Sequence, residues 1–354
     1  MTIPESVTLI GDYAFTGCSK LSTLNFNAIN CSDFNFGSYS GFRDSPLTTV
    51  TIGDNVNYIS SYFLYGQTGL NSVIIPESVT SIGNYAFYNC SGITSISMPD
   101  AVTSIGDYTF YNCLGIKTIT IPEDVTTIGD NAFSGCTGLS RLIFNAKSCD
   151  DFSSVSGFVD SPLTSATVGD NVTYIPAYFM YGQSKIDYIT MPEGLTEIGT
   201  YAFYGCTALD EFTFPSTMQK IGNRAFSLCS AITEMTVDAS VPPTIESKTF
   251  NGVDRSIPVY VAANYADAYR SHEYWKEFNI QGVGNITTST ETVKSDEIDF
   301  IQNGNTISFT EEQQVSVYSI NGVCVFSGIT RDLQLTTRGI YIVVTSSGTT
   351  KVII

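Results

Sequence analysis

A 23-residue internal repeat constrains the fold of this chain more than any other feature of its sequence. The string IPESVTSIGNYAFYNCSGITSISMP, which begins at Ile75, returns as MPDAVTSIGDYTFYNCLGIKTITIP from Met98 and as IPEDVTTIGDNAFSGCTGLSRLIF from Ile121. The apolar residues that precede the turn in successive copies are Ile3, Phe26, Ile52, Ile75, Met98, Ile121, Phe144, Val168, Met191, Phe214 and Val237. One such repeat cannot bury its own apolar face, whereas stacked copies form a continuous core, so the chain is expected to fold as a repeat solenoid.

Each copy follows the pattern L-x-x-[IV]-x-[IV]-P-x-x-V-x-x-I-G-x-x-A-F-x-x-C. The alternation over residues 73–75 predicts a short strand with its first and last side chains inward, ended by the proline that follows it. Ile82, Phe87 and Cys90 are expected to project inward from the return path. The glycine after the second isoleucine is expected to permit a tight turn. It stands at Gly83, Gly106 and Gly129.

The sequence also repeats with a second, longer period. The stretch that begins NFNAINCSDF at Asn25 reappears as IFNAKSCDDF from Ile143, a shift of 118 residues. A block of five repeats has therefore been duplicated.

These motifs resemble the BspA-like class of leucine-rich repeat, and the likeness covers about residues 1–283. It implies a right-handed solenoid of about 11–12 turns with a short parallel β-sheet on one face. Residues 242–283 look like that family's usual terminal cap. One apolar helix face is expected to close the core there. It comprises Tyr265, Ala268, Tyr269 and Trp275.

The last part of the chain is expected to be a different domain. Residues 284–297 read as a polar linker, and residues 298–354 read as a small all-β sandwich. The expected strands are Thr306–Phe309, Gln314–Ser319, Val323–Ser327, Gly339–Thr345 and Thr350–Ile354. This tail is similar to the C-terminal sorting domains of secreted Bacteroidetes proteins. The matching pieces are Val317-Tyr318, Asn321-Gly322, Gly339-Ile340-Tyr341 and Lys351-Val352.

That resemblance implies an extracellular or bacterial cell-surface protein. The chain starts inside a repeat at Met1-Thr2-Ile3-Pro4, so it is expected to lack a signal peptide and an N-terminal cap. Because an uncapped first repeat is an open edge, self-association through it is expected.

The charge balance excludes one class of partner. With 16 Lys and Arg against 34 Asp and Glu, the net charge is −18. Such a field repels phosphate backbones, so nucleic-acid binding is not expected. No apolar run approaches the roughly 20 residues of a membrane span, so no transmembrane segment is expected.

The nine cysteines of the chain are expected to be unpaired thiols. Six share one repeat position and are interpreted as a buried column of small apolar side chains. They are Cys18, Cys90, Cys113, Cys136, Cys206 and Cys229; the others are Cys31, Cys149 and Cys324. Neighbours in the column could approach bonding distance, but parallel side chains point alike rather than at each other.

The sequence gives little support for catalysis. The single histidine, His272, lies in the expected cap, and no nucleophile elbow, P-loop, dinucleotide fingerprint or HExxH motif is present. No Cys/His spacing indicates zinc. The chain is therefore not expected to be an enzyme or to need a cofactor.

Acidic residues form a column after the turn proline or the glycine that replaces it. Asp54, Glu77, Asp100 and Glu123 follow one another in this way, and Ca²⁺ is a natural bridge between stacked carboxylates. They are weak calcium candidates, because no dense ligand signature such as a repeated G-x-D motif accompanies them and a solvated turn is the favoured explanation. A second column of acid and amide side chains follows seven residues later. It comprises Asn84, Asp107 and Asp130.

The candidate binding residues lie on two surfaces. The outward strand positions are rich in Ser and Thr, while tyrosines flank the buried phenylalanines elsewhere. The candidates are Thr49, Thr51, Thr118, Thr120, Arg141, Tyr62 and Tyr178. The leading hypothesis is a non-catalytic surface or secreted adhesion module that binds extracellular or host proteins. The alternatives are a carbohydrate-binding protein that uses the tyrosines, and a passive structural spacer. If those tyrosine rings were buried, no aromatic surface would remain on which a glycan could bind.

Overall fold

The chain folds into two compact units. The computed structural model describes residues 1–34, 41–155, 157–283, 300–303, 306–319, 324–334, 340–345 and 349–353. The first unit, the solenoid, comprises Met1–Val261 and Tyr265–Gln281, and the second comprises Ala262–Asn264 and Gly282–Ile354. The expected linker, 284–297, lies outside the described residues.

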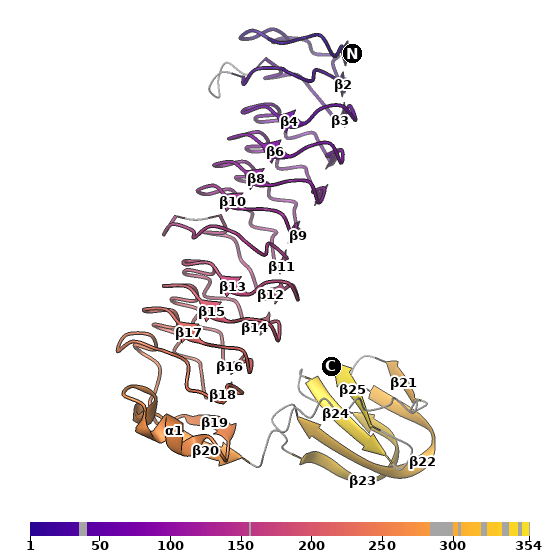
Figure 1. Cartoon of the computed structure of the whole chain (residues 1–354). Coiled ribbons are helices and arrows are strands. Elements are labelled where there is room, and N and C mark those ends of the chain that lie inside the picture. The colour runs from indigo at the N-terminus through magenta and orange to yellow at the C-terminus, as the bar shows by residue number, and fades with distance from the viewer. Residues whose placement is uncertain are drawn as a thin grey trace. The chain divides into compact units, whose positions relative to one another are not determined.

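Each turn of the solenoid contributes one short strand to parallel sheets along one side (Figure 1). These strands are β1 (Thr2–Ile3), β2 (Thr23–Phe26), β3 (Thr49–Ile52), β5 (Ser72–Ile74), β7 (Ser95–Ser97), β9 (Thr118–Ile121), β11 (Arg141–Phe144), β12 (Ser165–Val168), β14 (Tyr188–Thr190), β16 (Glu211–Phe214) and β18 (Glu234–Val237). Neighbours pair one repeat apart: Thr118 lies beside Arg141, and Ile121 beside Phe144. Val73 and Ile75 are buried, so the predicted inward alternation is confirmed.

A second parallel ladder runs along the return path, where only inward-pointing side chains had been predicted. Its strands are β4 (Tyr58–Ile59), β6 (Ser81–Ile82), β8 (Ser104–Ile105), β10 (Thr127–Ile128), β13 (Tyr174–Ile175), β15 (Glu197–Ile198) and β17 (Lys220–Ile221). Ser81 pairs with Ser104, and Ile82 with Ile105. In each two-residue strand the isoleucine enters the core and the polar residue faces outward, so two residues suffice for a strand.

The third side of each turn is a loop that is also hydrogen-bonded to the next turn. The backbone N–H groups of Tyr85, Phe87 and Asn89 donate to carbonyl oxygens one turn later at 2.8, 2.9 and 2.7 Å. Tyr85 and Asn89 adopt left-handed conformations, with φ of 58° and 61°. Every side of the turn therefore has partners for its backbone, which allows the repeats to stack closely.

The core is one continuous column of aliphatic and aromatic side chains. Phe87, Phe110 and Phe133 stack with ring centroids 5.2 Å apart at each step. The predicted inward positions of Ile82 and Cys90 are confirmed, because both are at most 1% exposed. In the first turn the equivalent side chains are partly exposed. These are Val7, Ile10 and Phe15.

The repeated glycine has a different role from the one predicted. Gly83, Gly106 and Gly129 are not among the residues with positive φ. A Cβ on Gly106 would lie 2.7 Å from the backbone nitrogen of Asn84, in the preceding turn. Glycine is therefore required by the close approach of two backbones rather than by a left-handed turn.

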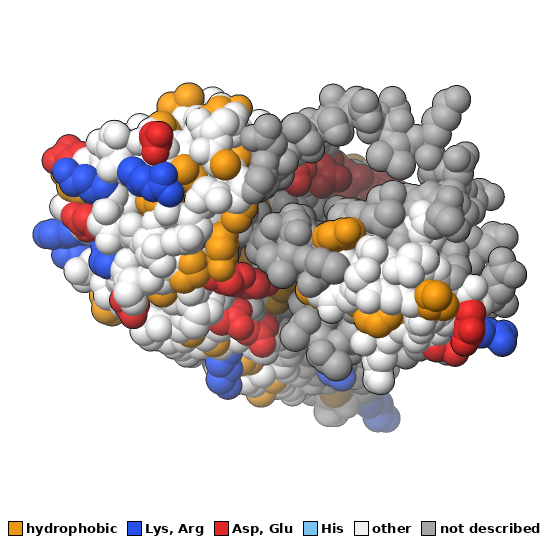
Figure 2. All heavy atoms as spheres, turned by 90° about the horizontal axis from the view of Figure 1, so that it is seen from below, with side chains coloured by type: hydrophobic (Ala, Val, Ile, Leu, Met, Phe, Trp, Pro, Cys, Tyr) orange, Lys and Arg blue, Asp and Glu red, His pale blue; other side chains and the backbone are white. Residues whose placement is uncertain are grey.

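The C-terminal end of the solenoid is closed by a cap. It comprises β19 (Pro258–Ala262), α1 (Ala266–Ser271), the 3₁₀ turn Trp275–Glu277 and β20 (Asn279–Val283). Tyr269 and Trp275 are fully buried and hydrogen-bond the carbonyl oxygens of Ala239 and Pro243. The prediction of a single helix face was wrong in part: Ala268 is exposed, and Trp275 lies beyond the six-residue helix. Figure 2 views the molecule from this end, where the coloured surface carries charges of both signs.

The second unit contains one five-stranded antiparallel sheet. Its strands are β21 (Phe300–Asn303), β22 (Thr306–Ser319), β23 (Cys324–Gln334), β24 (Ile340–Thr345) and β25 (Thr349–Ile353). Two strands expected separately, Thr306–Phe309 and Gln314–Ser319, are parts of β22, and its pairing with β23 shifts register between Ser308 and Gln313. The first part of β22 pairs with β21 and the last part with β24, so one long strand joins both halves of the sheet.

Candidate functional site

Tyrosines on the loop side of the solenoid form two stacked ladders. The first tyrosine ladder has two columns, Tyr62-Tyr85-Tyr108 and Tyr65-Tyr88-Tyr111. The second tyrosine ladder has the columns Tyr178-Tyr201 and Tyr181-Tyr204. Within every column neighbouring ring centroids lie 4.7–5.1 Å apart and the ring planes are within 9° of parallel.

The ladder follows directly from the repeat. Because equivalent residues of successive turns lie one strand spacing apart, identical aromatic residues at one repeat position are close enough to stack. The two columns of the first ladder lie 5.5–6.0 Å apart with rings tilted by 42–53° to one another. Adjacent columns therefore form a herringbone array.

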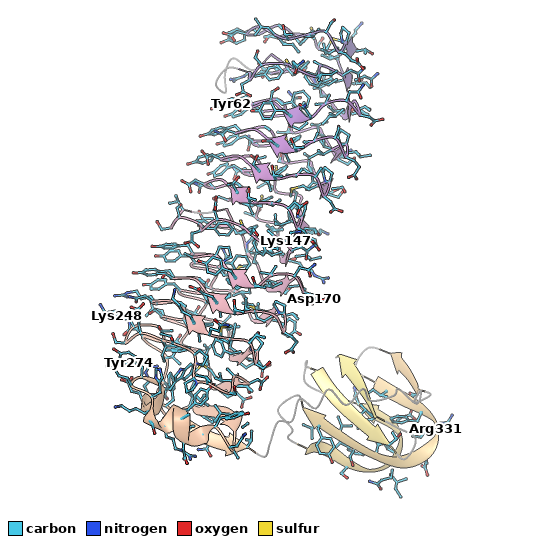
Figure 3. The ribbon with its side chains drawn as sticks, in the orientation of Figure 1. Tyr62, Lys147, Asp170, Lys248, Tyr274 and Arg331 are labelled. Atoms are coloured by element: carbon cyan, nitrogen blue, oxygen red, sulfur yellow. The ribbon has the colours of Figure 1, made fainter. Side chains whose placement is uncertain are left out.

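The tyrosine rings are neither buried nor fully exposed. All ten are partly exposed, and in Figure 3 Tyr62 lies on the opposite side of the solenoid from Asp170. Burial raises the pKa of Tyr88, and the neighbouring Tyr65 and Tyr111 raise it further. The middle rings, Tyr85 and Tyr88, have a stacked tyrosine on both faces, whereas each of the other eight rings has one stacked tyrosine in its column.

The turns between the two ladders lack these tyrosines. Asn131 and Ser134 occupy the corresponding positions after Tyr108 and Tyr111. The second ladder ends at Arg224, whose guanidinium carbon lies 5.9 Å from the centre of the Tyr201 ring. The recurrence of tyrosine every 23 residues predicted partly exposed rows of these rings, with Tyr62 and Tyr178 as the site candidates, but it did not predict that the rings stack.

The Ser/Thr candidates lie on the strand face, apart from the tyrosines. Their outward orientation is as expected, and Thr118 pairs with Arg141 on neighbouring strands. β3, which carries Thr49 and Thr51, is three strands from β9, which corresponds to about 14 Å. The structure therefore brings Thr118, Thr120 and Arg141 together but does not join them to Tyr62 or Tyr178.

The acid and amide column seven residues beyond the turn acids is a structural ladder. The side-chain oxygen of Asn84 accepts a hydrogen bond from the backbone N–H of Asp107 at 2.8 Å. The carboxylate of Asp107 accepts one from Asp130 at 2.9 Å. These side chains therefore bind the backbone of the next turn.

The calcium candidates do not come together as a ligand set. Asp54, Glu77, Asp100 and Glu123 are exposed, and Glu123 contacts the ammonium group of Lys147 at 3.5 Å. Within the described part of the chain, no three Asp, Glu, His or Cys side chains are placed to hold a metal ion.

Two kinds of cleft border the first ladder. A groove of about 460 Å³ follows β4, β6, β8 and β10, and Asn84 and Asp107 lie along it. A second cleft of about 720 Å³ is lined by Arg43, Asp44 and Tyr65. The duplication gives it a smaller counterpart of about 230 Å³ around Asp160.

The remaining reactive side chains have structural environments. His272 follows α1, and its Nδ1 accepts from the backbone N–H groups of Tyr274 and Trp275 at 3.3 and 3.4 Å. Burial raises the pKa of Cys90 to about 12, which leaves the thiol protonated at neutral pH. Cys18 is an unpaired thiol as predicted, but its predicted burial was wrong, because it is exposed on the first turn.

The 23-residue register, the buried Phe and Cys columns and the cap all agree with one repeat family. A family model described as the BspA type leucine rich repeat region matches residues 1–73, 58–183 and 153–265, with six copies. The chain belongs to the BspA-type leucine-rich repeat family.

Three solved structures are similar to this BspA-type chain, and the first of them shares its fold. A leucine-rich repeat protein from Bacteroides ovatus is 20% identical with a TM-score of 0.56, over 80% of this chain and 77% of that one. A leucine rich cell surface protein from Faecalibacterium prausnitzii is 21% identical with a TM-score of 0.28, over 80% and 91% of the two chains. The pneumococcal vaccine antigen PcpA is 17% identical with a TM-score of 0.37, over 80% and 87%.

No curated protein matches this BspA-type chain. Within its described residues, no helix has the length and apolar character needed to cross a membrane.

Proposed function

We propose that this BspA-type chain is a non-catalytic interaction module that binds extracellular or host proteins. The observation that carries the proposal is the first tyrosine ladder, in which six partly exposed rings form one surface across three turns. Tyrosine is enriched at protein interfaces because it supplies a large contact area with little loss of side-chain entropy. A rigid stack needs little further ordering when a partner binds.

The proposed location is the cell surface or the extracellular space. Support comes from the Faecalibacterium prausnitzii protein of related sequence, which is described as a cell surface protein. The matched family segments end at residue 265, so the sorting role of the tail stays a prediction.

Carbohydrate binding is less well supported than protein binding. Sugar rings commonly stack on aromatic faces, and every ladder ring has at least one face covered by a neighbouring tyrosine. A glycan would therefore find a free face only at the end rungs of a ladder.

Binding of the full chain to an array of matrix proteins and glycans tests the proposal. We expect saturable binding to at least one protein, reduced at least fivefold in a Tyr88→Ser/Tyr111→Ser variant. Serine stands at the equivalent position of a later turn, Ser134, so the solenoid accepts it there. Arg141→Ser, on the strand face, is the matched control. Binding to glycans alone, or equal loss in the control, would contradict the ladder as the protein-binding surface.

A further inference from the structure

The first tyrosine ladder presents a linear partner with a constant period. Tyr65, Tyr88 and Tyr111 follow one another at 4.7 and 4.9 Å, so alternate rings are about 9.6 Å apart, the sum of the two steps. A partner that runs along the solenoid axis contacts the ladder repeatedly only if its own side chains recur at a matching interval.

The regular polypeptide conformations differ in how well they match this interval. Side chains on one face of a β-strand recur at about 6.6–6.8 Å, and two turns of an α-helix span about 10.8 Å. A polyproline II helix has three residues per turn with a rise of about 3.1 Å, which gives about 9.3 Å per turn. Only the polyproline II helix comes within about 0.3 Å of two rungs.

The chemistry of the ladder also suits proline. Proline-rich segments dock on surfaces lined with aromatic side chains, and their preformed conformation reduces the entropy lost on binding. The herringbone tilt of 42–53° between the two columns gives a corrugated aromatic surface on which pyrrolidine rings can pack. Glycans match the ladder less well, because both faces of the middle rings Tyr85 and Tyr88 are covered by neighbouring tyrosines.

Charge indicates which proline-rich segments fit. Asp107 directly precedes Tyr108 in the chain, and the whole chain carries a net charge of −18. Arg43, which lines a cleft with Tyr65, is paired with Asp44 at 3.6 Å. In the second ladder the residue before Tyr178 is Ala177, the one before Tyr201 is Thr200, and the ladder ends at Arg224. The first ladder therefore favours a basic partner more than the second does.

We infer that the first tyrosine ladder binds a proline-rich segment that carries Lys or Arg between its prolines, in the polyproline II conformation and along the solenoid axis. This inference rests on the proposed function and names the partner class of the same surface. The second ladder, with two rungs and no acidic residue directly before any of its tyrosines, is the weaker site.

A pair of synthetic peptides tests the inference on the full chain. The probe is fluorescein-labelled (Pro-Pro-Lys)3, which spans about 28 Å as polyproline II. The control, (Gly-Ser-Lys)3, has the same length and charge but is flexible. We expect anisotropy titrations to give at least fivefold tighter binding of the proline peptide.

Matched variants locate the site. Tyr88→Ser/Tyr111→Ser is expected to abolish the preference for the proline peptide, whereas Tyr204→Ser in the second ladder should retain it. Thermal unfolding of each variant shows whether the solenoid stays folded, and Tyr108→Asn is a second test, because Asn131 occupies the equivalent left-handed position with φ of 55°. We expect Tyr108→Asn to weaken binding of the proline peptide as well.

Two results would overturn the inference: equal affinity for the two peptides, or a preference that survives in both first-ladder variants. Displacement of the proline peptide by cellohexaose at equal concentration would do the same, because it would assign the ladder to glycans. Saturable binding of the same chain to array proteins without a preference for the proline peptide would contradict this inference but not the proposed function. If the chain showed neither protein binding nor the peptide preference, both proposals would be contradicted.

Discussion

The thiol of Cys113 donates a hydrogen bond to the carbonyl oxygen of Phe87, 3.3 Å away and one turn earlier in the solenoid. Cys90, Cys136, Cys206 and Cys229 make the same bond to the preceding turn at 3.0–3.3 Å. Where the column lacks cysteine, other donors replace it. These are Ser45 and Gln67, which donate to the carbonyl of Phe42, and Ser161 and Gln183, which donate to that of Phe158. The column is therefore a series of buried donors as well as a series of small side chains.

Replacement of Cys113 by alanine is expected to destabilise the solenoid by about 1–3 kcal/mol, because a buried carbonyl loses its thiol donor and a small void remains. Cys113→Ser keeps a donor of similar size and should lose less. The midpoint of urea unfolding measures both changes. Cys18→Ala, on the uncovered first turn, is the control and is expected to change stability by less than about 0.5 kcal/mol. Equal losses for alanine and serine at position 113 would show that the hydrogen bond contributes nothing.

Gly106→Ala is expected to destabilise the protein by about 2–3 kcal/mol, because the new methyl group would overlap the backbone of the preceding turn. The chain offers a matched control at the same repeat position. Gly11 belongs to the first turn, and a Cβ there would have no atom within 4 Å. Gly11→Ala should therefore leave the thermal unfolding temperature nearly unchanged. If both variants unfold at the same temperature, close stacking is not the reason for the glycine.

The repeat made the main features of the fold predictable. The strand before each proline, the buried positions of Ile82, Phe87 and Cys90, and a cap that contains Trp275 all follow from apolar periodicity. Equivalent residues of stacked turns must lie near one another, so one repeat predicts the whole column.

Features that depend on contacts between turns were not predictable from that pattern. The side-chain oxygen of Asn84 accepts a hydrogen bond from the next turn. In the sequence, such an asparagine cannot be distinguished from a solvated turn residue. The role of Gly106 depends on the distance between two backbones, which composition does not encode. The tyrosine ladders were only partly foreseen, since side-chain direction decides whether recurring rings stack face to face or splay apart.

Stability is expected to depend on pH between about 4 and 6 through Asp238. Burial, and then the nearby Glu193, raise the pKa of this carboxyl group from 3.8 to about 6 in the folded state. The folded protein therefore favours the protonated form: the stabilisation is fully present below about pH 4 and is lost as the pH rises through about 6. Because the group is partly solvated, the effect is discounted to the order of 1 kcal/mol.

Asp238→Asn removes this titration and should raise the urea midpoint at pH 7 while flattening the profile between pH 4 and 6. Asp187→Asn, at an exposed acid, is the control and should leave the profile as in the wild type. A steep profile that persists in the Asp238 variant would assign the dependence to other carboxylates.

Leu228 occupies a position where the repeat usually places glycine or asparagine. Its φ is 64°, and the equivalent residues of the neighbouring turns are Gly205, with φ of 75°, and Gly252, with φ of 89°. A left-handed conformation costs an L-residue about 1–2 kcal/mol, whereas glycine adopts it freely but loses more entropy on folding. Because the leucine is 43% exposed, its removal forfeits little burial.

Leu228→Gly is therefore expected to stabilise the solenoid by about 0.5–1 kcal/mol, measured as a shift of the urea midpoint. Leu228→Ala separates strain from packing, since alanine removes most of the side chain but keeps the unfavourable φ. We expect the alanine variant to be no more stable than the wild type. If alanine and glycine give the same midpoint, backbone strain at this position is negligible and contact of the leucine with Gly252 decides its effect.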